Sequence, residues 1–377
     1  MNTNQSKQTF WIIFYGVLTS VSIVIMPMLV NVMKDTFGLS VAKAGQIASL
    51  ELAGVAVSTI AVASLLSRYT FKQLAIVSLL LIILGNTLSI LLTEYIMICR
   101  LIAGIGSGAS LALMSAKLAT QSNPEKGFAY FFTSYLLMAT VLFYSGIYIH
   151  NYLGATGVYK LISGFGIIAL FVIVLNKIQG FPKTSEEIQQ EKTIIKTDWK
   201  NIGVALFAML LFFIATGSVW VYMGQIGAAA GVSQENILSV LGNATIAGAV
   251  GSLLSSFVAS KLGRTTPLIL SVVILMFLMT GIMLFLDASN FTIIALSFVF
   301  IWMFSMPFLM GIVAVLDPQG RAASLGIGAQ NGGQSIGPAI ASVLIVGSNF
   351  TNVALMGVIC LGIALLLCVY VLLQIRK

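Results

Sequence analysis

Two charged side chains, Glu51 and Arg100, lie deep inside long apolar stretches of this sequence. A buried charge is costly in lipid, so it normally faces a partner or an aqueous cavity. At a helical rise of 1.5 Å per residue, Glu51 lies about 12 Å and Arg100 about 9 Å below the same membrane surface, so the two can pair. A nearby guanidinium favours the carboxylate and desolvation favours the acid. We expect a proton-coupling pair; the alternative is a static ion pair that only fixes two helices.

A stripe of amides forms a second candidate site. Gln330 and Gln334 are four residues apart, and Asn331 precedes Gln334 by three, so a helix places all three on one face. Amides near the middle of a membrane can bind a polar substrate, or they can only hydrogen-bond neighbouring helices. The further substrate-binding candidates are Asn243, Trp220, Tyr222, Tyr135 and Trp302. Trp220 and Tyr222 close an apolar stretch, where the first interpretation is an interfacial aromatic belt and the second a cavity.

Other kinds of chemistry have little support in the sequence. His150 is the single histidine, and Cys99, Cys360 and Cys368 form no CxxC pair, so we expect no metal site and no disulfide framework. A membrane-embedded enzyme would need clustered His, Asp or Glu near one face. A phosphate-binding loop of the G-x-x-x-x-G-K-[ST] type is also missing. We therefore expect no enzyme and no cofactor, with a proton gradient as the energy source.

The elements that position these residues are membrane-spanning helices. The chain is 59% hydrophobic and only 8% charged, whereas a soluble domain carries about 25% charged residues. A span needs about 20 apolar residues, and unpaired strands are too costly in lipid. Twelve stretches qualify: 10–33, 44–66, 73–92, 95–116, 127–149, 158–176, 202–224, 236–259, 266–286, 291–316, 321–346 and 351–374. The predicted fold is an all-α membrane protein of twelve transmembrane helices.

The Lys and Arg residues predict the orientation and the domains. With both termini in the cytoplasm, fifteen of the 19 basic residues fall on the inside, which is the bias that sets topology. The net charge of +8 thus reflects topology, and no nucleic acid is expected as a partner. The longest polar stretch, 177–201, is interpreted as a cytoplasmic linker between six-helix bundles at 1–176 and 202–377. We expect a monomer in the cytoplasmic (inner) membrane.

Repeated signals at equivalent places indicate that the two halves are related. Asn123-Pro124-Glu125-Lys126-Gly127 follows the fourth span, and Asp317-Pro318-Gln319-Gly320-Arg321 follows the tenth. The fourth span reads Arg100-Leu-Ile-Ala-Gly104-Ile-Gly106-Ser-Gly108, similar to the R-x-x-x-G-x-G-x-G pattern of the major facilitator superfamily. The chain resembles that superfamily over nearly its whole length. The resemblance implies two pseudo-symmetric six-helix bundles and links the buried arginine to proton coupling.

Further motifs of that superfamily are only partly kept. The loop after the second span keeps Arg68 and a trailing base but lacks the acid of the pattern, and the copy before the ninth span keeps Gly263-Arg264. A string ending in Gly337-Pro338 occurs in the eleventh span and is similar to efflux-type members. The candidate conformational or gating residues are therefore Arg68, Gly263, Arg264, Gly337 and Pro338. The proline marks an expected kink.

The resemblance implies a secondary transporter that moves a small molecule by alternating access, with proton-coupled efflux as the favoured mode. A drug, a sugar or a metabolite would each suit such an exporter. The alternatives are a proton-coupled uptake permease and a non-transporting membrane receptor or scaffold.

Overall fold

The computed structural model describes residues 3–66, 68–119, 124–175, 198–316 and 321–375, and these fold almost entirely into helices. In chain order the helices are α1 (Thr3–Val24), α2 (Met26–Phe37), α3 (Val41–Leu65), α4 (Phe71–Leu91), the 3-10 turn η1 (Thr93–Tyr95), α5 (Ile96–Ala119), α6 (Pro124–Leu153), α7 (Gly157–Leu175), α8 (Trp199–Val221), α9 (Met223–Ala229), α10 (Gln234–Leu262), α11 (Thr265–Leu284), α12 (Ala288–Leu316), α13 (Arg321–Leu344) and α14 (Thr351–Ile375).

Local signals explain where several helices start. Ser40, Thr70, Asp198 and Ser233 precede α3, α4, α8 and α10, and each side chain accepts a hydrogen bond from the backbone N–H three residues on. Such caps satisfy donors that the first turn leaves unpaired. The Gln73 side chain also accepts a hydrogen bond from the backbone N–H of Thr70, which completes a capping box.

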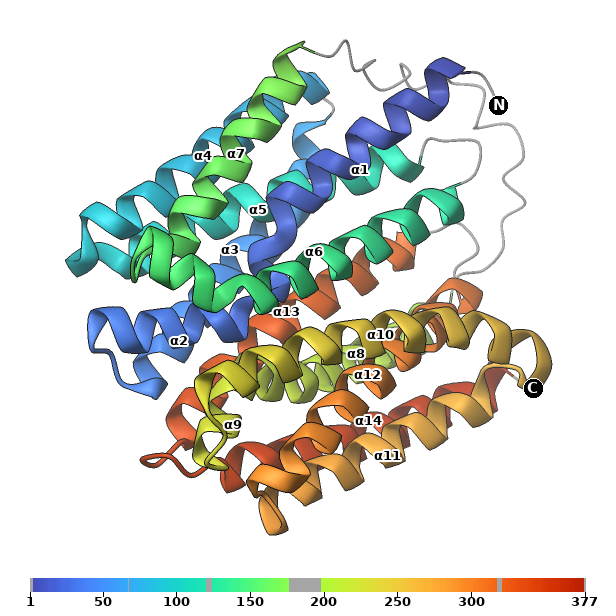
Figure 1. Ribbon diagram of the computed structural model, residues 1–377. Coiled ribbons are helices and arrows are strands. Elements are labelled where there is room, and N and C mark those ends of the chain that lie inside the picture. The colour runs from blue at the N-terminus through green and yellow to red at the C-terminus, as the bar shows by residue number, and fades with distance from the viewer. Residues whose placement is uncertain (1–2, 67, 120–123, 176–197, 317–320, 376–377) are drawn as a thin grey trace.

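Four glycines with positive φ, a conformation that costs other residues energy, lie in the connections at one end of the molecule. They are Gly38, Gly154, Gly231 and Gly347. We call this the Gly38 end; the opposite end, where α1 begins and α14 ends, is the terminal end (Figure 1).

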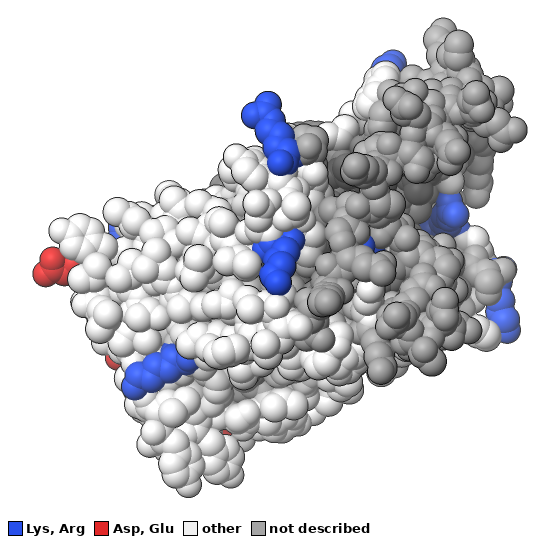
Figure 2. Space-filling view, turned by 90° about the horizontal axis from the view of Figure 1, so that it is seen from above, with Lys and Arg blue, Asp and Glu red and all other residues white. Residues whose placement is uncertain are grey.

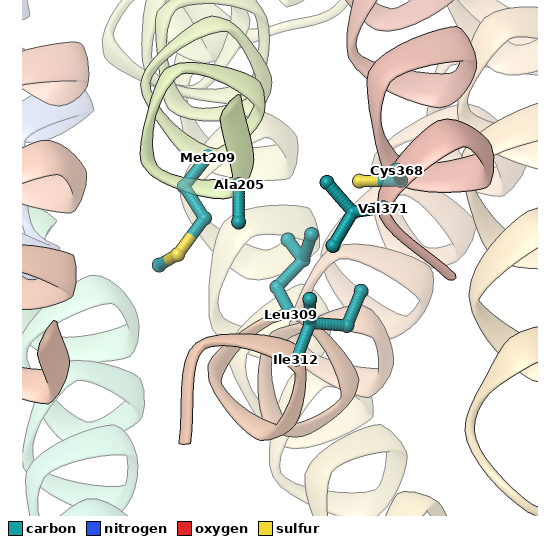
Figure 3. Close-up of a pocket in the computed structure, with 6 residues that line it drawn as sticks. All are labelled: Ala205, Met209, Leu309, Ile312, Cys368 and Val371. Carbon is teal, nitrogen blue, oxygen red and sulfur yellow. The ribbon is translucent and has the colours of Figure 1, made fainter. Parts of the chain in front are cut away.

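The helices pack in two groups that lie side by side (Figure 1). In the N-terminal group, α5 packs closely against α3 and α4, and α1 contacts α5, α6 and α7. In the C-terminal group, α8 packs against α13 and α14, and α10 against α12. Figure 3 shows part of the latter core, where Met209 of α8, Leu309 of α12 and Cys368 of α14 line one pocket. The groups meet chiefly where α3 packs on α13 and α6 on α10.

The number of apolar helices differs slightly from the twelve expected spans. Among the described helices, ten are long and apolar enough to cross a membrane, and the pair α1–α2 makes eleven if counted as one bent span. That pair bends by 54° at Ile25, so the expected single span 10–33 is not straight. The expected span 321–346 is present as α13 but is not among the eleven. Among the described residues, Figure 2 shows charged side chains that stand singly on a largely uncharged face, as lipid contact requires.

The expected linker, 177–201, lies mostly outside the described residues. Helix α8 begins at Trp199, three residues before the expected start, because Asp198 caps it. Of the repeated Asn/Asp-Pro signals, Asn123 and the whole of 317–320 also fall outside the described residues.

Glycines of the fourth-span pattern bring α5 unusually close to its neighbours. A Cβ on Gly104 would overlap the carbonyl oxygen of Glu51, and one on Gly108 would overlap that of Val55, so this face abuts the α3 backbone. A Cβ on Gly106 would lie 2.6 Å from the carbonyl oxygen of Ser78 on α4. Small residues permit such backbone contact between membrane helices. The Gly-x-Gly-x-Gly spacing therefore fits α5 between α3 and α4.

We predict that Gly104→Ala destabilises the protein. The added methyl group would overlap the α3 backbone, which cannot move as a side-chain end can, and overpacking of this kind costs about 1–3 kcal/mol. Thermal unfolding of the purified protein should therefore give a lower melting temperature. Gly164→Ala on α7 is the control, because no atom lies within 4 Å of its added Cβ. Equal melting temperatures for the two variants would contradict the packing argument.

Candidate functional site

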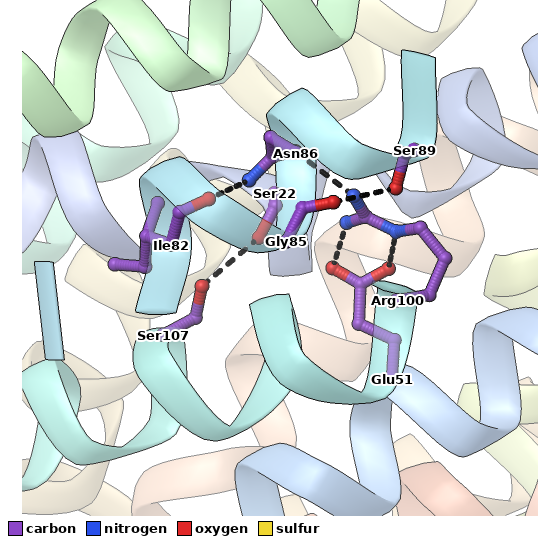
Figure 4. Close-up of polar contacts among 8 residues, drawn as sticks. All are labelled: Ser22, Glu51, Ile82, Gly85, Asn86, Ser89, Arg100 and Ser107. Carbon is purple, nitrogen blue, oxygen red and sulfur yellow. Dashed lines mark hydrogen bonds and ion pairs between the residues drawn. The ribbon is translucent and has the colours of Figure 1, made fainter. Parts of the chain in front are cut away.

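The predicted pair of Glu51 and Arg100 forms a two-pronged ion pair inside the N-terminal group (Figure 4). Arg100 Nε donates to Glu51 Oε2 at 2.9 Å, and Nη2 donates to Oε1 at 2.5 Å. Both side chains are fully buried. The fork of a guanidinium matches the two oxygens of a carboxylate, which makes this geometry both strong and specific. The two residues, which the sequence predicts to lie at similar depths in the membrane, are thus in direct contact.

Two further residues complete the surroundings of Arg100. Asn86 of α4 accepts a bond from Arg100 Nη1 at 2.8 Å, and its own amide nitrogen donates to the carbonyl oxygen of Ile82 (Figure 4). The Tyr159 ring of α7 lies 5.0 Å from the guanidinium carbon, and Phe37 of α2 stacks on that ring at 6.2 Å. Carboxylate, amide and aromatic face together replace the water that the guanidinium loses on burial.

The ion pair depends on both of its members. Removing either partner would leave a buried charge uncompensated, which costs about 3–5 kcal/mol. A movement that separates α3 from α5 would therefore break a costly pair.

Helix α3 carries the ion pair on one face and the contact with the other helix group on another. Ser49 Oγ donates to the Ser335 carbonyl oxygen at 2.6 Å, and Ser335 Oγ donates to the Ser49 carbonyl oxygen at 3.1 Å. One turn earlier, Gly45 lies directly against the Tyr222 hydroxyl, which an added Cβ would overlap. Any shift of α3 relative to α13 therefore also acts on the helix that holds Glu51.

Trp220 and Tyr222 are buried, so their interpretation as an interfacial belt is wrong. Tertiary packing places the end of α8 between the groups instead of against lipid. Trp220 Nε1 donates to the Val24 carbonyl oxygen at 3.2 Å, and its ring lies 6.2 Å from Trp302 and 6.3 Å from Phe143. Two of the predicted substrate-binding aromatics thus lie side by side, next to an aromatic ring of the N-terminal group.

The amides of α13 do not act as one stripe. Gln334 packs against Gly217 of α8, whereas Asn331 precedes Ser335 by one turn, on the side that meets α3. Gln330 and Gln334 are half-buried, and Asn331 is buried. Asn331 Nδ2 and Trp302 Nε1 are buried donors with no partner among the described residues. A buried donor left unpaired is costly unless water or a ligand satisfies it.

The remaining binding candidates, Asn243 and Tyr135, make other contacts than the aromatic residues and the α13 amides described above. Asn243 of α10 is exposed and accepts a bond from the Tyr144 hydroxyl of α6 at 2.7 Å, so it joins the two groups. Tyr135 is half-buried and stacks on Phe131 at 5.5 Å, within the N-terminal group.

The candidate gating residues fall at two places. Arg68 and Gly263-Arg264 are exposed in connections at the terminal end, where Arg264 Nη1 donates to the Gly311 carbonyl oxygen at 3.1 Å. Gly337 abuts the Ile214 carbonyl oxygen of α8, and Pro338 offers its carbonyl to Tyr222 at 3.4 Å. Helix α13 continues through Pro338 to Leu344.

Sequence reasoning missed Asn86, Tyr159 and the α3–α13 serines. Asn86 carried a usable signal, because it is a lone amide in a long apolar stretch and such groups need a partner in a membrane. The contacts of Tyr159, Ser49 and Ser335 join residues 59 to 286 positions apart, and no local pattern marks them.

The arrangement of two helix groups around central inter-group contacts defines a membrane transporter fold. The structure is similar to a crystal structure of a mutant nucleoside transporter, NupG, with a TM-score of 0.74 and 13% identity over 98% of this chain and 100% of that one. It is also similar to the peptide transporter POT in complex with alafosfalin (TM-score 0.76, 13% identity, 97% and 95% covered). A third match is the xylose transporter XylE from E. coli in a partially occluded inward-open conformation. Its TM-score is 0.71 and its identity 14%, over 94% of this chain and 96% of that one.

The family model of the Major Facilitator Superfamily matches residues 11–319, and the chain belongs to this family. It is a multi-pass secondary transporter of small molecules and not an enzyme. Among curated proteins, none matches the sequence.

We predict that Tyr159 stabilises Arg100 through its ring and not through its hydroxyl. The hydroxyl has no partner among the described residues, so Tyr159→Phe should melt close to the wild-type temperature. Tyr159→Leu removes the aromatic face from the guanidinium and should lose about 0.5–2 kcal/mol of stability. Thermal unfolding of both variants tests this. Destabilisation by Tyr159→Phe equal to that by Tyr159→Leu would instead assign the role to the hydroxyl.

Proposed function

We propose that this transporter couples the movement of a small molecule to protons through Glu51 and Arg100, and that it works as an exporter. The observation that carries the proposal is the fully buried two-pronged pair on α3 and α5. Ionisable residues inside a membrane bundle are costly and commonly mark proton relays. Glu51 lies on α3, the helix that contacts α13, so protonation of Glu51 and movement between the groups act on the same helix.

The proposed orientation places the terminal end in the cytoplasm and the Gly38 end outside. The excess of Lys and Arg in the connections of the terminal end supports it. The hydrogen bonds between groups that involve Ser49, Thr140, Tyr144, Trp220 and Gln225 lie between the helix midpoints and the Gly38 end. The structure then corresponds to a state closed toward the outside.

The proposed cycle uses the two groups as rocking halves, residues 1–176 and 202–377. Opening of the Gly38 end separates α3 from α13 and releases the serine pair and the Gly45–Tyr222 contact. We place the change in the Glu51–Arg100 geometry in a shift of α3 against α5 that accompanies this opening and gives outer water access to the carboxylate. Protonation of Glu51 weakens its attraction to Arg100, and return to the closed state expels the proton toward the cytoplasm while Arg100 pairs with Glu51 again.

The proposed substrate region lies around Trp220, Trp302, Gln330, Asn331 and Gln334, between the groups. Two buried donors that have no partner among the described residues, Trp302 Nε1 and Asn331 Nδ2, support a substrate with hydrogen-bond acceptors. The string ending in Gly337-Pro338 supports export, because it resembles that of efflux-type members. Proton-coupled uptake is the second candidate, supported by a match to a D-xylose–proton symporter.

Glu51→Gln is expected to abolish uphill transport and to preserve downhill exchange. The amide keeps the shape and two polar atoms of the carboxyl group but cannot bind and release a proton at working pH. The substrate is first identified by thermal stabilisation of the purified protein with nucleosides, D-xylose and peptides, after which the matched transporters are named. Flux is then measured in liposomes under an imposed pH gradient.

Asp35→Asn is the matched control for this experiment. It removes a carboxylate that is exposed and paired with Lys34, so uphill transport should persist. If folded Glu51→Gln still drives uphill transport with the wild-type pH dependence, Glu51 is not the proton carrier and the pair only fixes α3 to α5.

Gly45→Ala is expected to shift the protein toward opening of the Gly38 end. The added Cβ overlaps the Tyr222 hydroxyl, so it destabilises only the state in which α3 meets Tyr222. Spin labels at Glu94→Cys and Ser348→Cys, both exposed on the Gly38 end, should report a longer distance. Gly203→Ala, with no atom within 4 Å of its added Cβ, is the control. An unchanged distance distribution in Gly45→Ala would remove this contact from the closing mechanism.

A further inference from the structure

A cavity of about 380 Å³ lies at the Gly38 end, and neither Glu51 nor Arg100 is among the residues that line it. Met28 and Asn31 of α2, together with Ile147 and His150 of α6, form its N-terminal walls. Gln234 and Leu238 of α10 close it from the C-terminal group. The cavity is thus built from both helix groups, and it exists only while α10 lies against α2 and α6.

The walls combine an apolar surface with a few polar groups, as small-molecule sites do. Met28, Ile147 and Leu238 supply apolar contact. Thr36, His150 and Gln234 supply the polar part of the lining. The Asp35 carboxylate, which also lines the cavity, is paired with Lys34 at 3.2 Å, so the wall carries no uncompensated acid from this residue. The chemistry fits a neutral molecule with an apolar body and a polar end.

The cavity adjoins a polar contact that closes the Gly38 end. Gln225 of α9 donates to Asn31 Oδ1, and an added Cβ on neighbouring Gly224 would lie 2.9 Å from Asn31 Nδ2. Asn31 therefore touches both the cavity and the inter-group contact. A molecule bound in the cavity would contact α10 as well as α2, and separation of the groups would break half of its contacts.

We propose that this cavity is a regulatory site for a small neutral amphipathic molecule, whose binding holds the Gly38 end closed and slows turnover. A ligand shifts a conformational equilibrium by its difference in affinity for the two states. Here that difference is large, because one state has the complete cavity and the other has its walls apart. The effect is reciprocal, so conditions that open the Gly38 end weaken binding.

The test uses the full chain in lipid nanodiscs and N-benzylacetamide as the probe, since its ring suits the apolar walls and its amide group suits the polar part of the lining. The probe should raise the melting temperature. It should also shift the spin-label distances between Glu94→Cys and Ser348→Cys toward the shorter population.

Ala155→Trp is the deciding variant, because Ala155 lines the cavity from the exposed α6–α7 connection and a large side chain there fills it. It should abolish the probe's effect. Leu153→Trp, exposed and outside the lining, should leave the effect intact. Stabilisation that persists in Ala155→Trp, or binding without a distance shift, would overturn the proposal. Glu51→Gln should respond like wild type, so failure of proton coupling and failure of this site are distinguishable.

Discussion

The close approach of α3 to α5 is the constraint on which the rest of the site depends. Gly104 and Gly108 bring α5 against the carbonyl oxygens of Glu51 and Val55. Gly54 of α3 makes the approach mutual, since its Cβ would lie 2.8 Å from the Leu101 carbonyl oxygen. Only at this separation can both prongs of the guanidinium reach the carboxylate. The glycines therefore act on the ion pair through the backbone distance, although none of them contacts the charged atoms.

A buried ion pair is weak evidence for stability, because desolvation offsets much of its attraction. Its value in this transporter lies in the position of α3. That helix presents Glu51 to α5 and Ser49 to α13, so a movement between the halves and a change in the pair share one rigid element. Asn86 and Tyr159 come from α4 and α7 of the same half. The pair thus belongs to one half and is connected to the other half through α3.

The aromatic and amide residues between the groups follow from the same architecture. The end of α8 turns inward, so Trp220 and Tyr222 contact the other group and not lipid. Trp302 Nε1 and Asn331 Nδ2 are buried donors for which the described part of the chain supplies no partner. Such donors tolerate burial when water or a bound molecule completes them. The closed Gly38 end and the central polar groups are therefore parts of one inter-group surface.

The sequence by itself determined the all-helical membrane class, the family resemblance and the pairing of Glu51 with Arg100, because apolar length, charge asymmetry and a costly buried charge are local or compositional signals. Tertiary structure decided what those signals could not. It bent α1–α2 at Ile25, buried Trp220 and Tyr222, and split the α13 amides between two neighbours. Each outcome depends on which helix lies alongside, and such contacts join residues far apart in the chain, where periodicity carries no information.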